Sequence, residues 1–370
     1  MKRIFLVLLC FLVLGLSWTA SVVPTEAASA KQTTYVALGD SITSGYGLES
    51  FNKNDNANRS SAFGFTARLG KTLGMKTVNL GMEGIDSAML LKSLSKPATK
   101  AEKDAITQIK GAGLITISIG GNNIFIPLLN SVNENVPNGK NIYNADTTEL
   151  QAAVFKLLIS TAEINKLQEN ITKGVEAFTG NAKLKKTGDF AAIISKLKAL
   201  NPKAEIVVQT IYNPYDFILP DSVGKAVKTM NAEIVKGSGN GKNYKVADVY
   251  SAFLKAGNEV ALINSSLGKT FDPHPTKRGH EVIHILLSYA INGTLPLNMS
   301  LSVVKGKAVV AVREGEFVVT ITPAKGYKLP ETISLTIGKS KKTLSLKNSA
   351  AAIPVAAING DVTVAAVCSK

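Results

Sequence analysis

The chain alternates short apolar runs with longer stretches in which apolar residues recur every three or four positions. Short runs of this kind are typical of buried strands, and the longer periodic stretches are typical of amphipathic helices. The strand-like runs are Tyr35–Leu38, Thr77–Leu80, Leu114–Ile119, Glu205–Ile211 and Tyr244–Val249. The helix-like stretches include Ala62–Leu73, Ala101–Ile109, Glu149–Phe178, Asp189–Leu200 and Ser222–Val235. This order predicts an α/β fold: a parallel sheet with helices on both faces, in three layers.

The pattern changes after the helix-like stretch Arg278–Ala290, at the sequence Asn-Gly-Thr-Leu-Pro of residues 292–296. Short alternating runs such as Phe317–Thr322 and Thr332–Ile337 follow, separated by turn-forming dipeptides, which is typical of antiparallel strands. We therefore expect an α/β domain at residues 31–293 and a small all-β domain at residues 294–370.

The first 30 residues have the pattern of a secretory signal peptide. Lys2 and Arg3 precede an apolar core, and Ala28-Ser29-Ala30 is a small-x-small cleavage site before Lys31. A membrane anchor is the alternative, but the apolar run is short for a span. We therefore expect residues 1–30 to be removed and the protein to be secreted or associated with the cell surface.

Composition narrows the choice of partners. The 370 residues are 45% hydrophobic, which excludes wholesale disorder, and carry a formal net charge of +15. A basic exported protein is attracted to anionic wall polymers or lipid headgroups. Nucleic acid is disfavoured because the basic residues are dispersed. Without the signal peptide only Cys368 remains, so no internal disulfide is expected.

Four glycine-containing or polar blocks follow the predicted strands and helices. They are Gly39-Asp40-Ser41, the stretch from Asn79 to Gly84, Gly120-Gly121-Asn122-Asn123, and Asp272-Pro273-His274. Each block alone has an ordinary structural interpretation; Ser41, for example, could simply cap a helix. In a parallel sheet, however, ligands bind beyond the carboxyl ends of the strands, so these blocks are expected to gather at one edge.

Together the four blocks, in this order across about residues 33–291, resemble the SGNH (GDSL-type) hydrolase family. The resemblance implies ester hydrolysis without a cofactor or metal. It makes Ser41 the nucleophile, His274 the base that removes the serine proton, and Asp272 the acid that orients the base. It also implies that the oxyanion is bound by the backbone N–H groups of Ser41 and Gly84 and by the side-chain amide of Asn122.

Two positions depart from the family pattern. Asn123 stands where the family usually has an aspartate, and we expect it to support its loop. One residue fewer than usual separates Asp272 from His274. The shorter spacing leaves two possibilities for orienting the imidazole, the Asp272 carboxylate or a backbone carbonyl.

A second motif, His280-Glu281-Val282-Ile283-His284, matches the H-E-x-x-H pattern of helical zinc sites. The next acids, Glu314 and Glu316, belong to the all-β segment, and no histidine follows His284. We therefore expect ordinary helix residues here. Similarly, the apolar residues Ile124–Leu129 favour core packing over an acyl-chain groove or lid.

The residues from Phe317 to Lys370 resemble repeat modules of secreted Gram-positive proteins, which implies a bacterial source. From Leu297 onward the chain has ten Lys or Arg and four Asp or Glu, so this domain either binds wall polymers or is a spacer. The sequence predicts an exported carboxylic ester hydrolase acting on a glycan acetyl ester, a lipid or a small ester. The alternatives are a catalytically impaired surface- or wall-binding protein and, third, a zinc metalloprotease.

Overall fold

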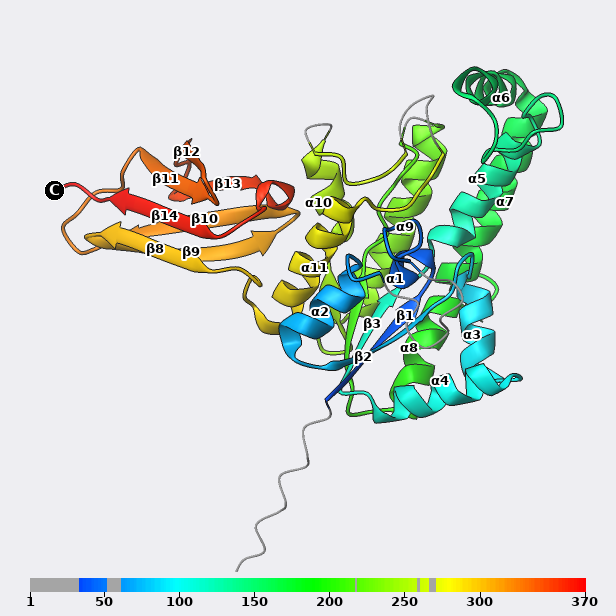
Figure 1. Cartoon of the computed structure of the whole chain (residues 1–370), viewed down its shortest axis with the longest axis horizontal. Coiled ribbons are helices and arrows are strands. Elements are labelled where there is room, and N and C mark those ends of the chain that lie inside the picture. The colour runs from blue at the N-terminus through cyan, green and yellow to red at the C-terminus, as the bar shows by residue number, and fades with distance from the viewer. Residues whose placement is uncertain (1–32, 52–60, 217, 258–259, 266–270) are drawn as a thin grey trace, which may run out of the picture. The chain divides into compact units, whose positions relative to one another are not determined.

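The computed structural model describes residues 33–51, 61–216, 218–257, 260–265 and 271–370 (Figure 1). The predicted signal peptide, residues 1–30, lies outside the described residues. Within them, no helix is both long enough and apolar enough to cross a membrane.

Five parallel strands form the central sheet, in the order β2-β1-β3-β6-β7. The strands are β1 (Thr34–Gly39), β2 (Lys76–Gly81), β3 (Leu114–Ser118), β6 (Glu205–Gln209) and β7 (Lys245–Ala247). Every residue of β3 is buried, as expected for the central strand of a sheet that is covered on both faces. The predicted parallel sheet is confirmed.

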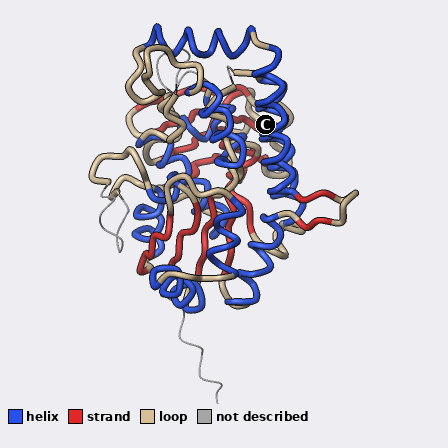
Figure 2. The backbone as a smooth tube through the Cα atoms, turned by 90° about the vertical axis from the view of Figure 1, so that its right-hand side faces the viewer, coloured by secondary structure: helices blue, strands red, loops and turns tan. Residues whose placement is uncertain are grey.

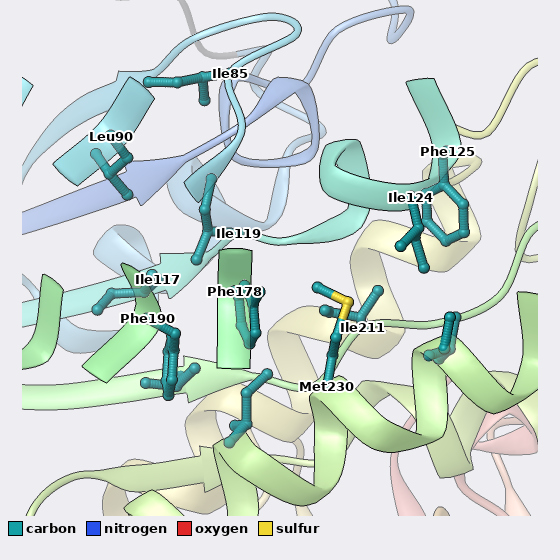
Figure 3. Close-up of a cluster of buried hydrophobic side chains, with 14 of the residues drawn as sticks. Ile85, Leu90, Ile117, Ile119, Ile124, Phe125, Phe178, Phe190, Ile211 and Met230 are labelled. Atoms are coloured by element: carbon teal, nitrogen blue, oxygen red, sulfur yellow. The ribbon is translucent and has the colours of Figure 1, made fainter. Parts of the chain in front are cut away.

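Alternate side chains of β1 belong to different apolar clusters, one on each face of the sheet. Val36 and Leu38 pack with buried residues of helices α3 to α9 (Figure 3), and Tyr35 and Ala37 pack with residues of α2, α10 and α11. Because successive strand residues point to opposite faces, this division gives the three layers (Figure 2). The helices are α1 (Ser41–Ser44), α2 (Phe65–Leu73), α3 (Ser87–Ser95), α4 (Lys100–Gly111), α5 (Gly121–Asn133), α6 (Thr147–Ile159), α7 (Thr161–Thr179), α8 (Asp189–Leu200), α9 (Pro220–Gly237), α10 (Val249–Ala256) and α11 (Lys277–Asn292).

The helices differ from the sequence prediction at one break. The stretch expected as one helix over 149–178 is divided between α6 and α7 at Ser160, whose side chain accepts a hydrogen bond from the backbone N–H of Glu163. A serine that caps a new helix competes with continuation of the old one. The apolar residues that follow Asn122 lie in α5, where Ile124 and Leu128 are buried in the core, as predicted. The short hairpin of β4 (Gly180–Asn181) and β5 (Lys186–Thr187) follows α7.

The C-terminal segment is all β apart from one short 3₁₀ turn, η1 (Val355–Ala357). Its two sheets have the orders β13-β10-β9 and β12-β11-β14-β8, with β14 and β8 parallel and the other pairs antiparallel. Alternate residues of β10 and β11 are buried, and the strands confirm a small all-β region. The strands are β8 (Met299–Val304), β9 (Gly306–Arg313), β10 (Glu316–Pro323), β11 (Thr332–Ile337), β12 (Ser340–Ser345), β13 (Ala350–Pro354) and β14 (Val362–Val367).

The all-β segment packs against helices of the α/β part. The Arg278 guanidinium donates hydrogen bonds to the carbonyl oxygens of Ala356 (2.8 Å) and Ile358 (2.6 Å). A Cβ atom on Gly315 would lie 2.4 Å from the carbonyl carbon of Ser251 in α10. Only glycine therefore fits at this position, which directly precedes β10. Residues 33–370 form one compact unit. The predicted boundary after Gly293 therefore marks a change of architecture without a break in packing, and the division into two domains stays a prediction.

Candidate active site

The turn after β1 places Ser41 at the carboxyl edge of the sheet. Gly39 has φ of 140°, and a Cβ there would lie 1.9 Å from the carbonyl oxygen of Ser118 on β3. Only glycine permits this close approach of the two strands. The Asp40 side chain then caps α1 by accepting a hydrogen bond from the backbone N–H of Ile42 (3.1 Å). Ser41 begins the helix, directly beyond the strand end.

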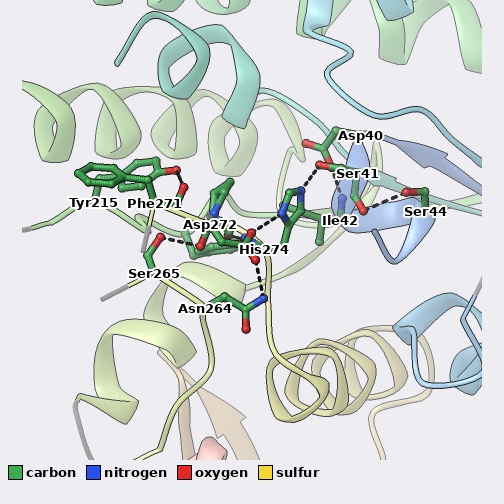
Figure 4. Close-up of polar contacts among 12 residues, drawn as sticks. Asp40, Ser41, Ile42, Ser44, Tyr215, Asn264, Ser265, Phe271, Asp272 and His274 are labelled. Atoms are coloured by element: carbon green, nitrogen blue, oxygen red, sulfur yellow. Dashed lines mark hydrogen bonds and ion pairs between the residues drawn. The ribbon is translucent and has the colours of Figure 1, made fainter. Parts of the chain in front are cut away.

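The structure brings Ser41, Asp272 and His274 together (Figure 4). The His274 ring nitrogen Nε2 lies 2.9 Å from Ser41 Oγ. On the other side of the ring, Nδ1 lies 2.5 Å from Asp272 Oδ1. The same carboxylate oxygen also accepts a hydrogen bond from the backbone N–H of His274 (3.0 Å). The spacing of only one intervening residue thus allows a tight turn in which the carboxylate reaches the imidazole directly.

A neighbouring loop supports the Asp272 carboxylate. The side-chain amide of Asn264 donates a hydrogen bond to Asp272 Oδ2 (2.9 Å), and the Asn264 backbone N–H donates to the His274 carbonyl (3.0 Å). The Ser265 hydroxyl donates to the Asp272 carbonyl (2.6 Å). No local sequence pattern relates residue 264 to residue 272, so this support could not be predicted from the sequence.

Two buried tyrosines anchor the main chain of the same turn. The Tyr212 hydroxyl donates to the carbonyl of Pro273 (2.6 Å), and the Tyr215 hydroxyl donates to that of Phe271 (2.7 Å). Both tyrosines follow β6 at the edge where the other blocks lie. The rule that ligand-binding residues follow strand ends could have identified them.

Two carboxylates near His274 have opposite pKa shifts. Burial tends to raise the pKa of Asp272, but the hydrogen bonds from His274 and Asn264 outweigh it, so the pKa lies below the usual value. Burial raises the pKa of Asp40 to about 6, against the opposing effects of the Ile42 N–H and of His274. Asp272 is therefore ionised at neutral pH, whereas Asp40 titrates only slightly below neutral pH.

The residues expected to bind an oxyanion also lie at the carboxyl edge. Gly84 follows β2 with φ of 73°, in the left-handed region that favours glycine. Asn122 is the second residue of α5, just after β3, and its side-chain amide donates one hydrogen bond to the carbonyl of Ile85 (2.8 Å). A carboxamide NH₂ has two hydrogens, so this bond orients the Asn122 amide and leaves its second hydrogen for a ligand.

Asn123 has a different environment from Asn122. Its amide donates to Ser87 Oγ (2.8 Å) and to the carbonyl of Gly174 (3.3 Å), and its Oδ1 accepts from the backbone N–H of Ser87 (3.1 Å). These bonds join α3, α5 and α7. The amide that replaces the family's usual acid is thus a buried link between helices, which is the supporting role expected from the sequence.

The H-E-x-x-H residues take part in packing α11 against α2. His280 is fully buried, stacks on Phe65 and accepts a hydrogen bond at Nδ1 from the Phe65 backbone N–H (3.3 Å). His284 Nε2 lies 2.9 Å from the Thr72 hydroxyl oxygen. Among the described residues, no group of three or more His, Cys, Asp or Glu could hold a metal ion. Both imidazoles serve as helix residues, as expected.

Residues 37–282 match the family model of the GDSL-like lipase/acylhydrolase family, which is well over half of the chain. The chain belongs to this family. The match ends inside α11 and includes every residue that the sequence analysis placed in the site. The chain matches none of the curated proteins with which it was compared.

Several solved structures resemble this GDSL-family chain at low identity. A phospholipase A1 from Streptomyces albidoflavus NA297 is 17% identical, with 70% of this chain and 99% of that chain covered and a TM-score of 0.46. An extracellular lipase from Streptomyces rimosus is 19% identical, with 70% and 99% covered and a TM-score of 0.46. A variant of an acetyl-xylooligosaccharide esterase from Geobacillus is 14% identical, with 70% and 94% covered and a TM-score of 0.39.

Replacing Asn123 should reduce stability. Asn123→Ala removes three hydrogen bonds and leaves buried polar groups of Ser87 without that partner, each at a cost of about 1–3 kcal/mol. We expect the free energy of unfolding, measured by urea denaturation, to fall by about 2 kcal/mol or more. The control is Asn122→Ala, which removes one hydrogen bond from a partly exposed side chain. Equal losses in the two variants would contradict the assignment.

His280 should make the fold sensitive to acid. Burial lowers its pKa to about 3 in the folded state, against about 6.5 for an ordinary histidine. Below pH 6.5 the unfolded chain therefore binds a proton that the folded chain does not, and the free energy of unfolding falls as the pH falls toward 3.

His280→Gln keeps an acceptor for the Phe65 N–H but does not titrate. We expect urea denaturation between pH 7.5 and 4.5 to show a smaller loss of stability on acidification in this variant than in the original protein. Two curves that run parallel across this range would show that His280 does not contribute.

Proposed function

We propose that this GDSL-family hydrolase is an exported carboxylic ester hydrolase that uses Ser41, His274 and Asp272. The proposal rests on the contact from Asp272 Oδ1 to His274 Nδ1 (2.5 Å) and on that from His274 Nε2 to Ser41 Oγ (2.9 Å). With the Nδ1 proton directed at the carboxylate, Nε2 is the acceptor that a serine nucleophile requires.

In the first half-reaction, Ser41 Oγ attacks the ester carbonyl carbon and its proton passes to His274 Nε2. The imidazolium is stabilised by the Asp272 carboxylate, whose lowered pKa keeps it ionised. The tetrahedral oxyanion accepts hydrogen bonds from the backbone N–H groups of Ser41 and Gly84 and from the amide of Asn122. Collapse of this intermediate breaks the C–O bond, and His274 protonates the leaving alcohol.

In the second half-reaction, water attacks the acyl-serine carbonyl. His274 removes the water proton and then returns a proton to Ser41 Oγ as the acid product leaves. The grounds for an inactive alternative are the short spacing of Asp272 and His274 and the presence of Asn123 in place of the usual acid. The direct contact between Asp272 and His274 and the helix-linking hydrogen bonds of Asn123 favour the active enzyme. Suitable substrates are a glycan acetyl ester, a lipid or a small ester.

The all-β segment is proposed to attract anionic cell-wall polymers. The exposed lysines of β12 and the turn before it support this, because Lys339, Lys341 and Lys342 lie close together in the sequence and at the surface. Attraction of this kind depends on ionic strength, since the Debye length falls from about 8 Å at physiological salt to about 3 Å at 1 M.

Ser41→Ala should abolish turnover of a short p-nitrophenyl ester, because loss of a serine nucleophile lowers kcat by about 10⁶. The matched control is Ser44→Ala in the same helix. The buried Ser44 hydroxyl donates a hydrogen bond to the carbonyl of Ser41 (3.1 Å). Among the described residues it makes no hydrogen bond with His274, so we expect Ser44→Ala to keep most of the activity. Turnover should resist a zinc chelator and be blocked by a serine-directed phosphonate. Activity that survives in Ser41→Ala, or is lost to the chelator, would refute the proposal.

Asn264 should act as a positioning residue through Asp272. Removing one hydrogen bond to a charged group corresponds to about tenfold in rate, so Asn264→Ala should lower kcat about tenfold with little change in KM. Asp272→Asn should cost about 10⁴ in kcat. The control is Ser265→Ala, which loses a hydrogen bond to the Asp272 carbonyl and none to the Asp272 carboxylate among the described contacts. If Asn264→Ala and Ser265→Ala have the same kinetics, Asn264 does not support the carboxylate.

A further inference from the structure

A small cavity lies beside the nucleophile turn, at the carboxyl ends of three adjacent strands. Its volume is about 20 Å³, and its lining includes Asp40 after β1, Ser118 at the end of β3 and Gln209 at the end of β6. Asp40 and Ile42, the two chain neighbours of Ser41, both line it (Figure 4). The cavity is therefore in contact with the turn that carries the nucleophile.

Two polar side chains that line this cavity, those of Gln209 and Asp40, are deeply buried and have few hydrogen-bond partners among the described residues. Gln209 is 3% exposed, and its amide nitrogen Nε2 has no hydrogen-bond partner among the described residues. Asp40 is also 3% exposed. Its Oδ1 accepts one good hydrogen bond, from the Ile42 N–H at 3.1 Å, and a marginal one from Ser118 Oγ at 3.5 Å. A buried amide donor thus shares a cavity with a buried carboxylate that has room for another donor.

Neither an unpaired amide donor at Gln209 nor a carboxylate with few donors at Asp40 is favourable in the protein interior. A buried polar group without a partner costs about 1–3 kcal/mol, and native proteins pair the large majority of such groups with protein or with ordered water. A charge buried with few donors is costlier still. The unpaired Gln209 amide needs a hydrogen-bond acceptor, and the Asp40 carboxylate can accept a further hydrogen bond. One small molecule with both an acceptor and a donor satisfies both groups.

We propose that this cavity binds one water molecule that accepts a hydrogen bond from Gln209 Nε2 and donates one to the Asp40 carboxylate. A cavity must have a volume of roughly 10–15 Å³ to hold one water molecule, which then makes two to four polar contacts. The volume here admits one such molecule, and Asp40, Ser118 and Gln209 supply the contacts. Phe125 and Ile211 contribute apolar side chains to the rest of the lining.

The bound water has a consequence for the active site that rests on the proposed function. Asp40 lies within electrostatic range of His274 and of the Tyr212 hydroxyl. A hydrogen bond donated to the carboxylate favours its ionised form. The ionised form of Asp40 in turn stabilises the imidazolium that develops on His274 during acyl transfer. The water and Gln209 are thus positioning groups behind the nucleophile, and they do not contact the substrate.

The test compares the original protein with Gln209→Met, which keeps the side-chain volume and removes the donor. A crystal structure of the original protein at high resolution should show one ordered water within hydrogen-bond distance of Gln209 and Asp40, and this water should be missing in Gln209→Met. The carboxyl carbon of Asp40, assigned with Asp40→Asn and titrated by NMR, should show a pKa about one unit higher in Gln209→Met. The control Gln151→Met alters an exposed glutamine on α6 and should leave the titration unchanged.

Three results would overturn the proposal. They are a dry cavity in the original protein, an acyl group of a bound substrate analogue in place of the water, and an Asp40 pKa that is the same in Gln209→Met. These measurements need no ester turnover. An inactive protein that retains the water would refute the proposed function alone, and an active protein with a dry cavity would refute the water site alone.

Discussion

The site depends on the close parallel approach of β1 to β3. At the end of these strands, a side chain on Gly39 would overlap the carbonyl oxygen of Ser118, and the Asp40 N–H donates to that same oxygen (3.1 Å). This bond extends the sheet one residue beyond the last paired position and turns the chain into α1. The position of Ser41 is therefore fixed by backbone pairing, because the buried N–H and carbonyl groups at this strand end are hydrogen-bonded to each other. His274, the proposed base, is 233 residues away from Ser41 in the chain, so the distance between the two side chains is set by the sheet and by the loops that follow its strands.

The site contains two carboxylates whose environments give them different properties. Asp272 is partly exposed and receives hydrogen bonds from His274 and Asn264, which keep its pKa low. Asp40 is sealed between strand ends, where burial raises its pKa. Pairs of acids with separated pKa values are a common way for one site to hold distinct roles. Here the exposed acid contacts the imidazole directly, and the buried one shapes the turn that carries the nucleophile and acts on His274 through space.

The sequence predicts most of the architecture because its periodicities are local. The strands of the central sheet, the all-β segment and the four blocks at the carboxyl edge all follow from patterns a few residues long. The break at Ser160 depends on a local cap, but the apolar periodicity of residues 149–178 continues across it and hides it. The parallel pairing of β14 with β8 does not follow from such patterns, since it joins segments about 60 residues apart in the chain. The same limit applies within the site. Asn264 and Gln209 act through contacts with distant residues, and nothing in their own neighbourhood in the sequence marks them.

The turn that carries His274 is also held in place by α11, which begins three residues later. Thr276 caps this helix by accepting from the Gly279 N–H (3.1 Å), and a Cβ on Gly279 would lie 2.2 Å from the carbonyl oxygen of Leu262. The first turn of α11 therefore packs closely against the loop that contains both Leu262 and Asn264. On its other side, Arg278 binds two carbonyl groups of the all-β segment and pairs with Glu281 (3.0 Å). His274, the proposed base, thus lies between the loop that supports Asp272 and a helix whose first turn contacts the all-β segment. The all-β segment therefore affects the site through packing, although it supplies none of the proposed reacting groups.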